Sequence, residues 1–219
     1  MNEKVVHLDE TAAENAYNEI LKMIISKSLY KGEKISETAL VEKLNISRTP
    51  IRQALLRLSK EGLVEVKTKC YTKIADYSSE YIMQFGIVRV WLDIMSVKLA
   101  ILNGSNAEFE VLEEICSQYE KAIEEKNIEE KNRLDCIFHK EITKIAKNEI
   151  LMQFQDEMYQ KVMFIMAYSD YDARDKMRSL NQHRKILKAL KDRDPEEAVS
   201  HIKKHLYDFY GLTDKQTLF

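Results

Sequence analysis

The stretch Ser47–Leu58, with the sequence SRTPIRQALLRL, decides the fold of the first part of this 219-residue chain. Three apolar side chains recur in it at the spacing of one helical face: Ile51, Leu55 and Leu58. Arg48 and Arg52 lie four residues apart and share a second, outward face. The pattern predicts an amphipathic helix that buries one side and presents arginines on the other.

Pro50 indicates where this helix begins. Proline fits a helix within the first turn, where its missing N–H costs nothing. The helix therefore starts close to Ser47 and Thr49, and either hydroxyl can cap it. This places Arg48, Thr49 and Arg52 at the N-terminal end, which a recognition helix presents to base edges and phosphates in the major groove of DNA.

The flanking sequence predicts the rest of a winged helix-turn-helix. An apolar stripe before the stretch indicates a first helix, which we expect Gly32 to end: Tyr17, Ile20, Leu21, Ile24 and Ile25. Ser36 can cap a second helix that carries Leu40 and Leu44. After Glu61-Gly62, alternating apolar residues over 63–66 and 71–74 predict a two-stranded hairpin, the wing.

Charge supports a nucleic-acid partner for this part of the chain. From Lys22 to Lys73 there are twelve lysines or arginines against five acidic residues, whereas the whole chain has a formal net charge of −2. The positive charge is concentrated where contacts to phosphate need it.

Residues 17–74, with SETALVEKLNISRTPIRQALLRLSKEGLVEV at their centre, resemble the N-terminal domain of GntR-type transcription regulators. The remainder resembles the all-helical FCD effector domain of the FadR-like branch. The resemblance implies that Arg48, Thr49 and Arg52 contact the operator, with Ser47 on phosphate. Two features depart from the family pattern: Thr38 stands where the family often has an arginine, and the wing lacks the usual glycine. The wing still offers three lysines to phosphate: Lys67, Lys69 and Lys73.

Composition sets the frame for the rest of the chain. With 45% hydrophobic residues, five glycines and two prolines, it can bury a large core and favours long helices. The apolar runs are too short to span a membrane and the N-terminus is polar, so we expect a cytoplasmic protein with no membrane partner. The three cysteines are expected to be reduced thiols.

We predict a mainly α protein with a boundary after residue 76. Residues 1–76 form the winged helix-turn-helix, and residues 77–219 form a helical bundle for effector binding and dimerisation. Six helices are expected in the bundle, in agreement with the shorter FCD version: 79–102, 106–126, 128–146, 148–170, 171–192 and 195–212. Ser78 or Ser79 can cap the first of them.

The bundle contains a second functional signal, a set of metal-ligating residue types. Asp135 and His139 lie four residues apart on one predicted helix, His183 lies on the fifth and His205 on the sixth. A carboxylate and three imidazoles suit Zn, Ni, Fe or Mn and leave coordination positions open. By resemblance, metal-binding FCD domains use an aspartate and a histidine four apart plus two later histidines, and these four residues match. His201 competes with His205 but is expected outside the site.

The resemblance also implies a small organic acid as effector. Its carboxylate would bind at the open metal positions, and Arg89 would pair with it through a guanidinium fork. Arg89 could instead serve a domain or dimer interface. Asn148 matches a recurrent family position, as an effector contact or as a helix cap. A homodimer would place two recognition helices on an inverted-repeat operator, with the effector changing DNA affinity.

Two other readings of the bundle remain open. A metal with an open position activates water, so the bundle could be a metallohydrolase, although no general base is clearly placed beside the four residues. Alternatively, the bundle is a metal-free dimerisation module. The residues leave the metal, the effector, the operator and the sign of regulation undecided.

Overall fold

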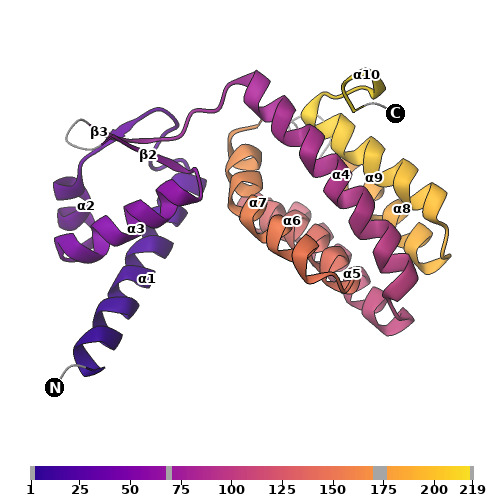
Figure 1. Ribbon diagram of the computed structural model, residues 1–219, viewed down its shortest axis with the longest axis horizontal. Helices are drawn as coiled ribbons and strands as arrows, with labels where there is room; N and C mark the ends of the chain where they lie inside the picture. The colour runs from indigo at the N-terminus through magenta and orange to yellow at the C-terminus, as the bar shows by residue number, and fades with distance from the viewer. Residues whose placement is uncertain (1–2, 68–70, 170–176, 218–219) are drawn as a thin grey trace. The chain divides into compact units, whose positions relative to one another are not determined.

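The computed structural model describes residues 3–67, 71–169 and 177–217. The chain divides into two compact units, Met1–Asp76 and Tyr77–Phe219, drawn in Figure 1. Each unit has its own buried core, and the two are described in turn.

The first unit is a winged helix-turn-helix, as predicted. Its elements, in chain order, are α1 (Glu3–Ile25), β1 (Lys34–Ile35), α2 (Glu37–Leu44), α3 (Arg48–Lys60), β2 (Val64–Lys67) and β3 (Tyr71–Ile74). The predicted apolar stripes of the three helices meet in one core: Ile20, Ile24, Leu40, Ile51, Leu55, Leu58, Leu63 and Ile74 are buried. Helix α3 packs against α1 and α2, which leaves its arginine face in solvent.

The turn between α2 and α3 is built from local signals. The Ser36 hydroxyl accepts a hydrogen bond from the Ala39 N–H and caps α2. Asn45 ends α2 in the left-handed conformation, with φ +54°. Ser47 is the N-cap residue of α3, but its side chain makes no capping hydrogen bond, and Thr49 lies inside the helix. The expectation that a hydroxyl caps α3 is therefore wrong, because the Ser47 side chain does not turn toward the helix N–H groups.

Two expectations for the first unit need correction. The predicted hairpin is confirmed as β2 and β3, but the sheet has a third strand, because Lys34–Ile35 pairs antiparallel with the other edge of β3 and gives the order β1-β3-β2. The first helix ends at Ile25, before Gly32. The chain turns at Lys27, which has φ +61°, and Gly32, with φ +75°, belongs to the turn that leads into β1.

The second unit is a bundle of helices: α4 (Ser79–Asn103), α5 (Asn106–Glu124), α6 (Ile128–Ile145), α7 (Glu149–Tyr168), α8 (Arg178–Lys191), α9 (Pro195–Tyr210) and α10 (Asp214–Thr217). Helices α4, α9, α8, α5 and α6 pack on one another in that order and α6 returns to α4, so they enclose a common interior, and α7 lies against α6 (Figure 1). Residues on the inner faces of these helices are therefore brought together although they are far apart in sequence.

Three joints of the bundle share one local design. A long cationic residue takes the left-handed conformation and the next residue caps the following helix: Lys126 and Asn127, Lys147 and Asn148, Arg193 and Asp194. Asn and Asp side chains satisfy the first free N–H groups of a helix, which stabilises it by about 1 kcal/mol. These joints hold α6, α7 and α9 in register with their neighbours.

The other boundaries agree with the prediction, with two exceptions. The predicted helix 171–192 begins at Arg178 in the structure, and its first part, residues 171–176, lies outside the described residues. The short helix α10 follows Gly211, which has φ +66° and ends α9, and it was not predicted. No described helix combines the length and apolar character that a membrane span requires.

Candidate functional site

The N-terminal end of α3 presents the predicted DNA-contacting residues to solvent. Ser47, Arg48, Thr49 and Arg52 are all exposed, while Pro50 on the opposite side is buried. The Ser47 hydroxyl makes no capping hydrogen bond to α3. Cationic side chains, a hydroxyl and a helix N-terminus together suit phosphate and base edges. On α2, Thr38 is exposed as well.

The wing lysines have different surroundings. Lys67, at the end of β2, is exposed. Lys73 on β3 is partly buried and its Nζ lies 2.9 Å from Oε2 of Glu65, so its charge is already paired. Lys69 lies outside the described residues. Of the two wing lysines that the structure describes, Lys67 is thus the better placed for phosphate.

The four predicted metal ligands come together inside the bundle. Helix α6 supplies Asp135 and His139 one turn apart, α8 supplies His183 and α9 supplies His205. All four side chains are at least 96% buried. One ligand atom from each residue lies within 4.8 Å of the corresponding atoms of the other three. The circular arrangement of the helices explains this convergence. The faces of α6, α8 and α9 that carry the four residues all point toward the common interior.

The distances between these atoms suit a single small cation. Nε2 of His205 lies 3.2 Å from Nε2 of His139 and 3.3 Å from Nε2 of His183. Oδ1 of Asp135 lies 3.3 Å from Nε2 of His183. Ligands about 2.0–2.1 Å from one ion are separated by about 2.8–3.4 Å at angles between octahedral and tetrahedral. Asp135, His139, His183 and His205 could therefore bind a metal ion with little movement.

The outward nitrogens of two histidines strengthen this assignment. Nδ1 of His205 lies 3.0 Å from Oε1 of Gln182, and Nδ1 of His139 lies 3.2 Å from Oδ2 of Asp93. The Gln182 amide oxygen only accepts, so it favours the proton on Nδ1 of His205, and the Asp93 carboxylate places negative charge beside Nδ1 of His139. The Nε2 atoms of the two rings face each other at 3.2 Å, an arrangement that a cation between them stabilises.

Protonation of the cluster also fits metal ligation. Burial lowers the pKa of His183, and it lowers the pKa of His205 well below the ordinary imidazole value. Burial opposes ionisation of Asp135, but the neighbouring His183, His139 and His205 outweigh it, so the pKa of this carboxyl lies below its usual range. Neutral imidazoles and an ionised carboxylate are the forms that bind metals.

The predicted effector residue Arg89 lies on α4 and is buried. Its Nη1 donates to the Tyr210 hydroxyl at 3.1 Å, and its Nε lies 3.4 Å from Oδ2 of Asp93. Asp93 therefore connects the Arg89 guanidinium to His139. Burial disfavours the charge of Arg89, but Tyr210, Asp93 and Asp135 outweigh it and raise its pKa.

Asn148 occupies a different environment. It is exposed, and its Oδ1 accepts a hydrogen bond from the Leu151 N–H at 2.9 Å, which caps α7. Of the two predicted roles of Asn148, the structure shows the helix cap. His201 likewise lies outside the cluster, where its Nε2 is 3.1 Å from Oε2 of Glu197.

Sequence reasoning missed several residues of the site. Gln182 is hydrogen-bonded to the outer nitrogen of His205, Asp93 lies beside that of His139, and the amide of Gln155 from α7 donates to Asp93. The Phe138 ring stacks on His183 with ring centroids 4.3 Å apart. Asp93 carried one detectable signal, since it lies four residues after Arg89 on an apolar helix, where a paired carboxylate is expected.

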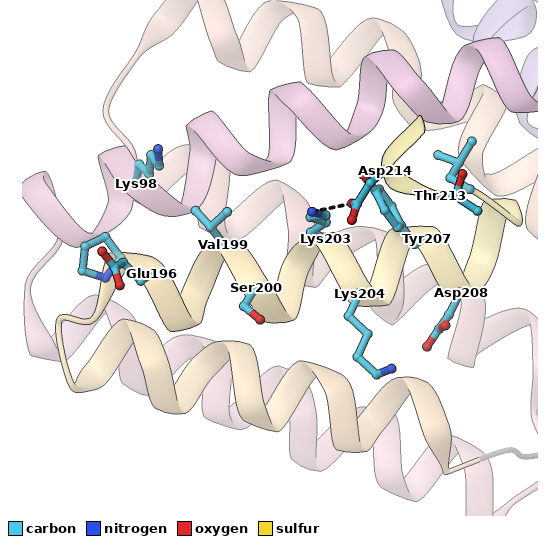
Figure 2. Close-up of a pocket in the computed structure, with 12 residues that line it drawn as sticks. Lys98, Glu196, Val199, Ser200, Lys203, Lys204, Tyr207, Asp208, Thr213 and Asp214 are labelled. Atoms are coloured by element: carbon cyan, nitrogen blue, oxygen red, sulfur yellow. Dashed lines mark ion pairs between the residues drawn. The ribbon is translucent and has the colours of Figure 1, made fainter. Parts of the chain in front are cut away.

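A wide surface groove of about 910 Å³ lies apart from the buried cluster, along α9 and α10 (Figure 2). Its lining includes Lys98, Lys204, Asp208 and an ion pair between Lys203 and Asp214. Asp208 at its edge also accepts a hydrogen bond from Gln182, so the groove and the cluster share one hydrogen-bonded chain.

A winged helix-turn-helix that exposes a cationic helix end, followed by a helical bundle, defines a class of DNA-binding transcription regulators. Residues 12–74 match the bacterial regulatory proteins of the gntR family, and residues 87–208 match the FCD domain. The chain belongs to the GntR family, in its FadR-like branch with a C-terminal FCD domain, which confirms the resemblance.

Two related transcription regulators agree with this assignment. The chain is 28% identical to the HTH-type transcriptional regulator YdhC of Bacillus subtilis (strain 168), covering 86% of this chain and 85% of that protein. It is 22% identical to the HTH-type transcriptional repressor RspR of Escherichia coli (strain K12), and the match covers 88% of this chain and 84% of that protein.

Solved structures share the fold. A GntR regulator from Rhodococcus sp. RHA1 superimposes with a TM-score of 0.79 at 17% identity, over 92% of this chain and 96% of that chain. McbR/YncC of E. coli superimposes with a TM-score of 0.75 at 21% identity, over 89% of this chain and 93% of that chain. The homologues are transcription regulators and not enzymes, which argues against the metallohydrolase reading.

Proposed function

We propose that this DNA-binding regulator is a homodimeric repressor whose FCD domain holds a divalent metal ion and binds a small carboxylate effector that changes operator affinity. The observation that carries the proposal is the convergence of three imidazole Nε2 atoms and the Asp135 carboxylate in the bundle interior. The ion, when bound, supplies a positive charge with open coordination positions for an anionic ligand.

Metal content per protomer tests the centre directly. Protein purified without chelator or affinity metal should contain about one Zn, Ni, Fe or Mn per chain, measured by elemental analysis. His139→Ala and His183→Ala should lose the metal. His201→Ala is the matched control, because His201 lies outside the cluster and should leave the metal content unchanged. Wild type that stays metal-free after each ion is added back would favour the dimerisation module instead.

The effector proposal rests on charge. Asp135 and Asp93 each carry a negative charge and Arg89 a positive one, so a divalent ion bound by neutral imidazoles would leave the interior with a positive charge that a carboxylate balances. The contacts of Arg89 to Tyr210 and Asp93 use Nη1 and Nε, and the guanidinium carries further N–H donors for a bidentate carboxylate.

A calorimetric titration with small mono-, di- and tricarboxylates tests this proposal. Binding should need the metal-loaded protein and should weaken in Arg89→Lys, which keeps the charge but loses the fork. Equal binding to metal-free and metal-loaded protein would contradict the arrangement. An operator titration with and without the bound acid then gives the sign of regulation; release of DNA by the acid is the result expected of a repressor relieved by its ligand.

We further propose that Ser47, Arg48, Thr49 and Arg52 read the operator, with Lys67 and Lys73 of the wing on phosphate together with Lys69. Support comes from the exposure of the α3 N-terminus and from the excess of positive charge in residues 22–73. A fluorescence titration at physiological salt should show preference for an operator over competitor DNA. Equal affinity for operator and competitor DNA would contradict sequence-specific binding.

A second copy of the chain is the partner we propose for an apolar face of the bundle. On α4, four exposed apolar side chains follow one another at spacings of three, four and seven residues: Val88, Trp91, Met95 and Leu102. A cavity of about 370 Å³ lies between α4 and α7, and its lining includes Val88 of this face and Phe154 of α7. Apolar residues at such spacing form helix-pairing seams.

The polar edge of the same cavity favours self-association. Glu157 and Lys161 line it four residues apart on α7. Across a two-fold axis each copy would set its glutamate against the other copy's lysine, which is the self-complementarity that an isologous interface needs. A dimer also supplies the two recognition helices that an inverted-repeat operator requires.

A further inference from the structure

The most informative feature outside the four candidate ligands is the hydrogen-bonded chain behind His205. Gln182 on α8 lies between His205 and Asp208, both on α9. Its Oε1 is 3.0 Å from Nδ1 of His205, and its Nε2 donates to Oδ2 of Asp208 at 2.7 Å. The same Oδ2 lies 2.6 Å from Nη2 of Arg178.

The donors and acceptors in this series of hydrogen bonds can be arranged in one order. The Asp208 carboxylate lies beside the Arg178 guanidinium and accepts hydrogen bonds there, so it receives the NH₂ end of the Gln182 amide. The oxygen of Gln182 is thereby turned toward His205. An amide oxygen also only accepts, so Nδ1 of His205 carries the proton and Nε2 keeps its lone pair for the interior.

The opposite orientation of the amide would defeat ligation. A rotated Gln182 would present its NH₂ group to Nδ1 of His205 and favour the tautomer with the proton on Nε2. That proton would point at the Nε2 atoms of His139 and His183, which lie 3.2 and 3.3 Å away, and would occupy the lone pair that a metal needs. The orientation of one amide therefore decides whether His205 is a ligand.

We propose that Gln182, held by Asp208 and Arg178, is the positioning residue that keeps His205 in its metal-binding tautomer. The inference rests on the metal centre proposed above and adds a determinant of its affinity. Partners of this kind orient ligating histidines, and their loss costs about 10–100-fold in metal affinity.

The series of hydrogen bonds from His205 to Arg178 runs from the interior of the bundle to its surface. Gln182 and His205 are buried, whereas Asp208 is partly exposed and lines the groove along α9 (Figure 2). Arg178 is about half exposed. The orientation of a buried ligand is thus set by an ion pair that solvent reaches. His139 differs, because its outer nitrogen faces the buried carboxylate of Asp93.

Metal titration of full-length variants tests the inference. Gln182→Met keeps a similar volume and removes both hydrogen bonds, and we expect its affinity for Zn²⁺ to fall about 10–100-fold, measured by competition with a chromophoric chelator. Gln153→Met, an exposed position on α7, is the matched control and should bind as wild type. Wild-type affinity in Gln182→Met would overturn the inference while leaving the metal centre intact.

A second variant tests the same chain without opening the core. Asp208→Ala frees the Gln182 amide to rotate, and we expect a smaller loss of about 3–10-fold because water replaces the carboxylate at this partly exposed position. Asp214→Ala is its control, since it removes a carboxylate from the same groove that pairs with Lys203 instead. Equal effects of the two substitutions would contradict a specific role for Asp208.

The tautomer itself is measurable in the metal-free protein. Nitrogen-15 shifts of the His205 ring should show a protonated Nδ1 in wild type and a mixture of tautomers in Gln182→Met. An unchanged Nδ1–H form in the variant would overturn the inference. Failure of wild type to bind any metal would instead contradict the metal centre, so the two failures are distinguishable.

Discussion

His139 on α6 and His205 on α9 face each other in the interior of the bundle with their Nε2 atoms 3.2 Å apart. Their rings are stacked, with centroids 5.1 Å apart and an interplanar angle of 19°. Sixty-six residues separate them in the chain. Gln182 and Asp93 lie beside the outer nitrogens of these rings, and the inner nitrogens are close enough to share one cation.

Metal should therefore stabilise the folded protein. Because the site exists only when α6, α8 and α9 are assembled, free metal at about 100 times its Kd should add about 2.7 kcal/mol to the free energy of unfolding. Calorimetry with and without added Zn²⁺ measures this gain. His139→Ala should show none of it, whereas His201→Ala should show it in full; a gain in both variants would place the metal elsewhere.

Arg52 should contribute specificity to DNA binding. Its exposed position near the start of α3 predicts that Arg52→Ala weakens operator binding by about 1–3 kcal/mol and nonspecific binding by less. Anisotropy titrations with operator and competitor DNA compare the two losses. Equal losses would make Arg52 a phosphate contact. Arg133→Ala is the control, since Arg133 is an exposed arginine of the bundle that pairs with Glu130.

The apolar face of α4 should be needed for dimerisation. Val88→Asp places a charge in the proposed seam and should shift sedimentation toward a monomer, because burying an unpaired carboxylate costs several kcal/mol. Val111→Asp is the matched control: Val111 is similarly exposed but lies on α5. If both variants remain dimeric, the interface lies on another face.

Gly86 should be required for the packing of Tyr210 beside Arg89. A Cβ atom at Gly86 would lie 2.5 Å from Cγ of Tyr210, so Gly86→Ala should destabilise the protein by about 1–3 kcal/mol in denaturant titrations. Combining it with Tyr210→Ala should recover part of that loss, since the clash disappears. Gly211→Ala tests a different cause of destabilisation. A Cβ atom at Gly211 meets no atom within 4 Å, but the backbone there has φ +66°, which strains any residue with a Cβ.

Cys116 should be inert to thiol reagents in the native protein. Burial raises the pKa of its thiol to about 12, so at pH 8 roughly one thiol in ten thousand is ionised. Alkylation followed by mass spectrometry should show slow labelling of Cys116 that rises about tenfold per pH unit and becomes fast on unfolding. Rapid labelling of the folded protein near neutral pH would contradict the buried placement.

Local signals in the sequence were sufficient for most of the architecture. Ser36, Ser78 and Asn127 cap helices at the predicted starts, and the arginine-bearing helix begins one residue after Ser47. Capping, helical spacing and turn residues act over a few neighbours, so they can be read from the chain alone. The third strand was not predictable in this way, because Lys34–Ile35 becomes a strand only by pairing with β3, about forty residues later.

The sequence by itself determined the types of the candidate ligands and the pairing of Asp135 with His139, because residues four apart on a helix share a face. Only the tertiary structure decided that His183 and His205 join them and His201 does not, since this depends on how α8 and α9 are rotated in the bundle. It also decided the partners that orient the histidines. Asp93 and Gln182 come from other helices, and polar contacts between helices have no fixed spacing in sequence.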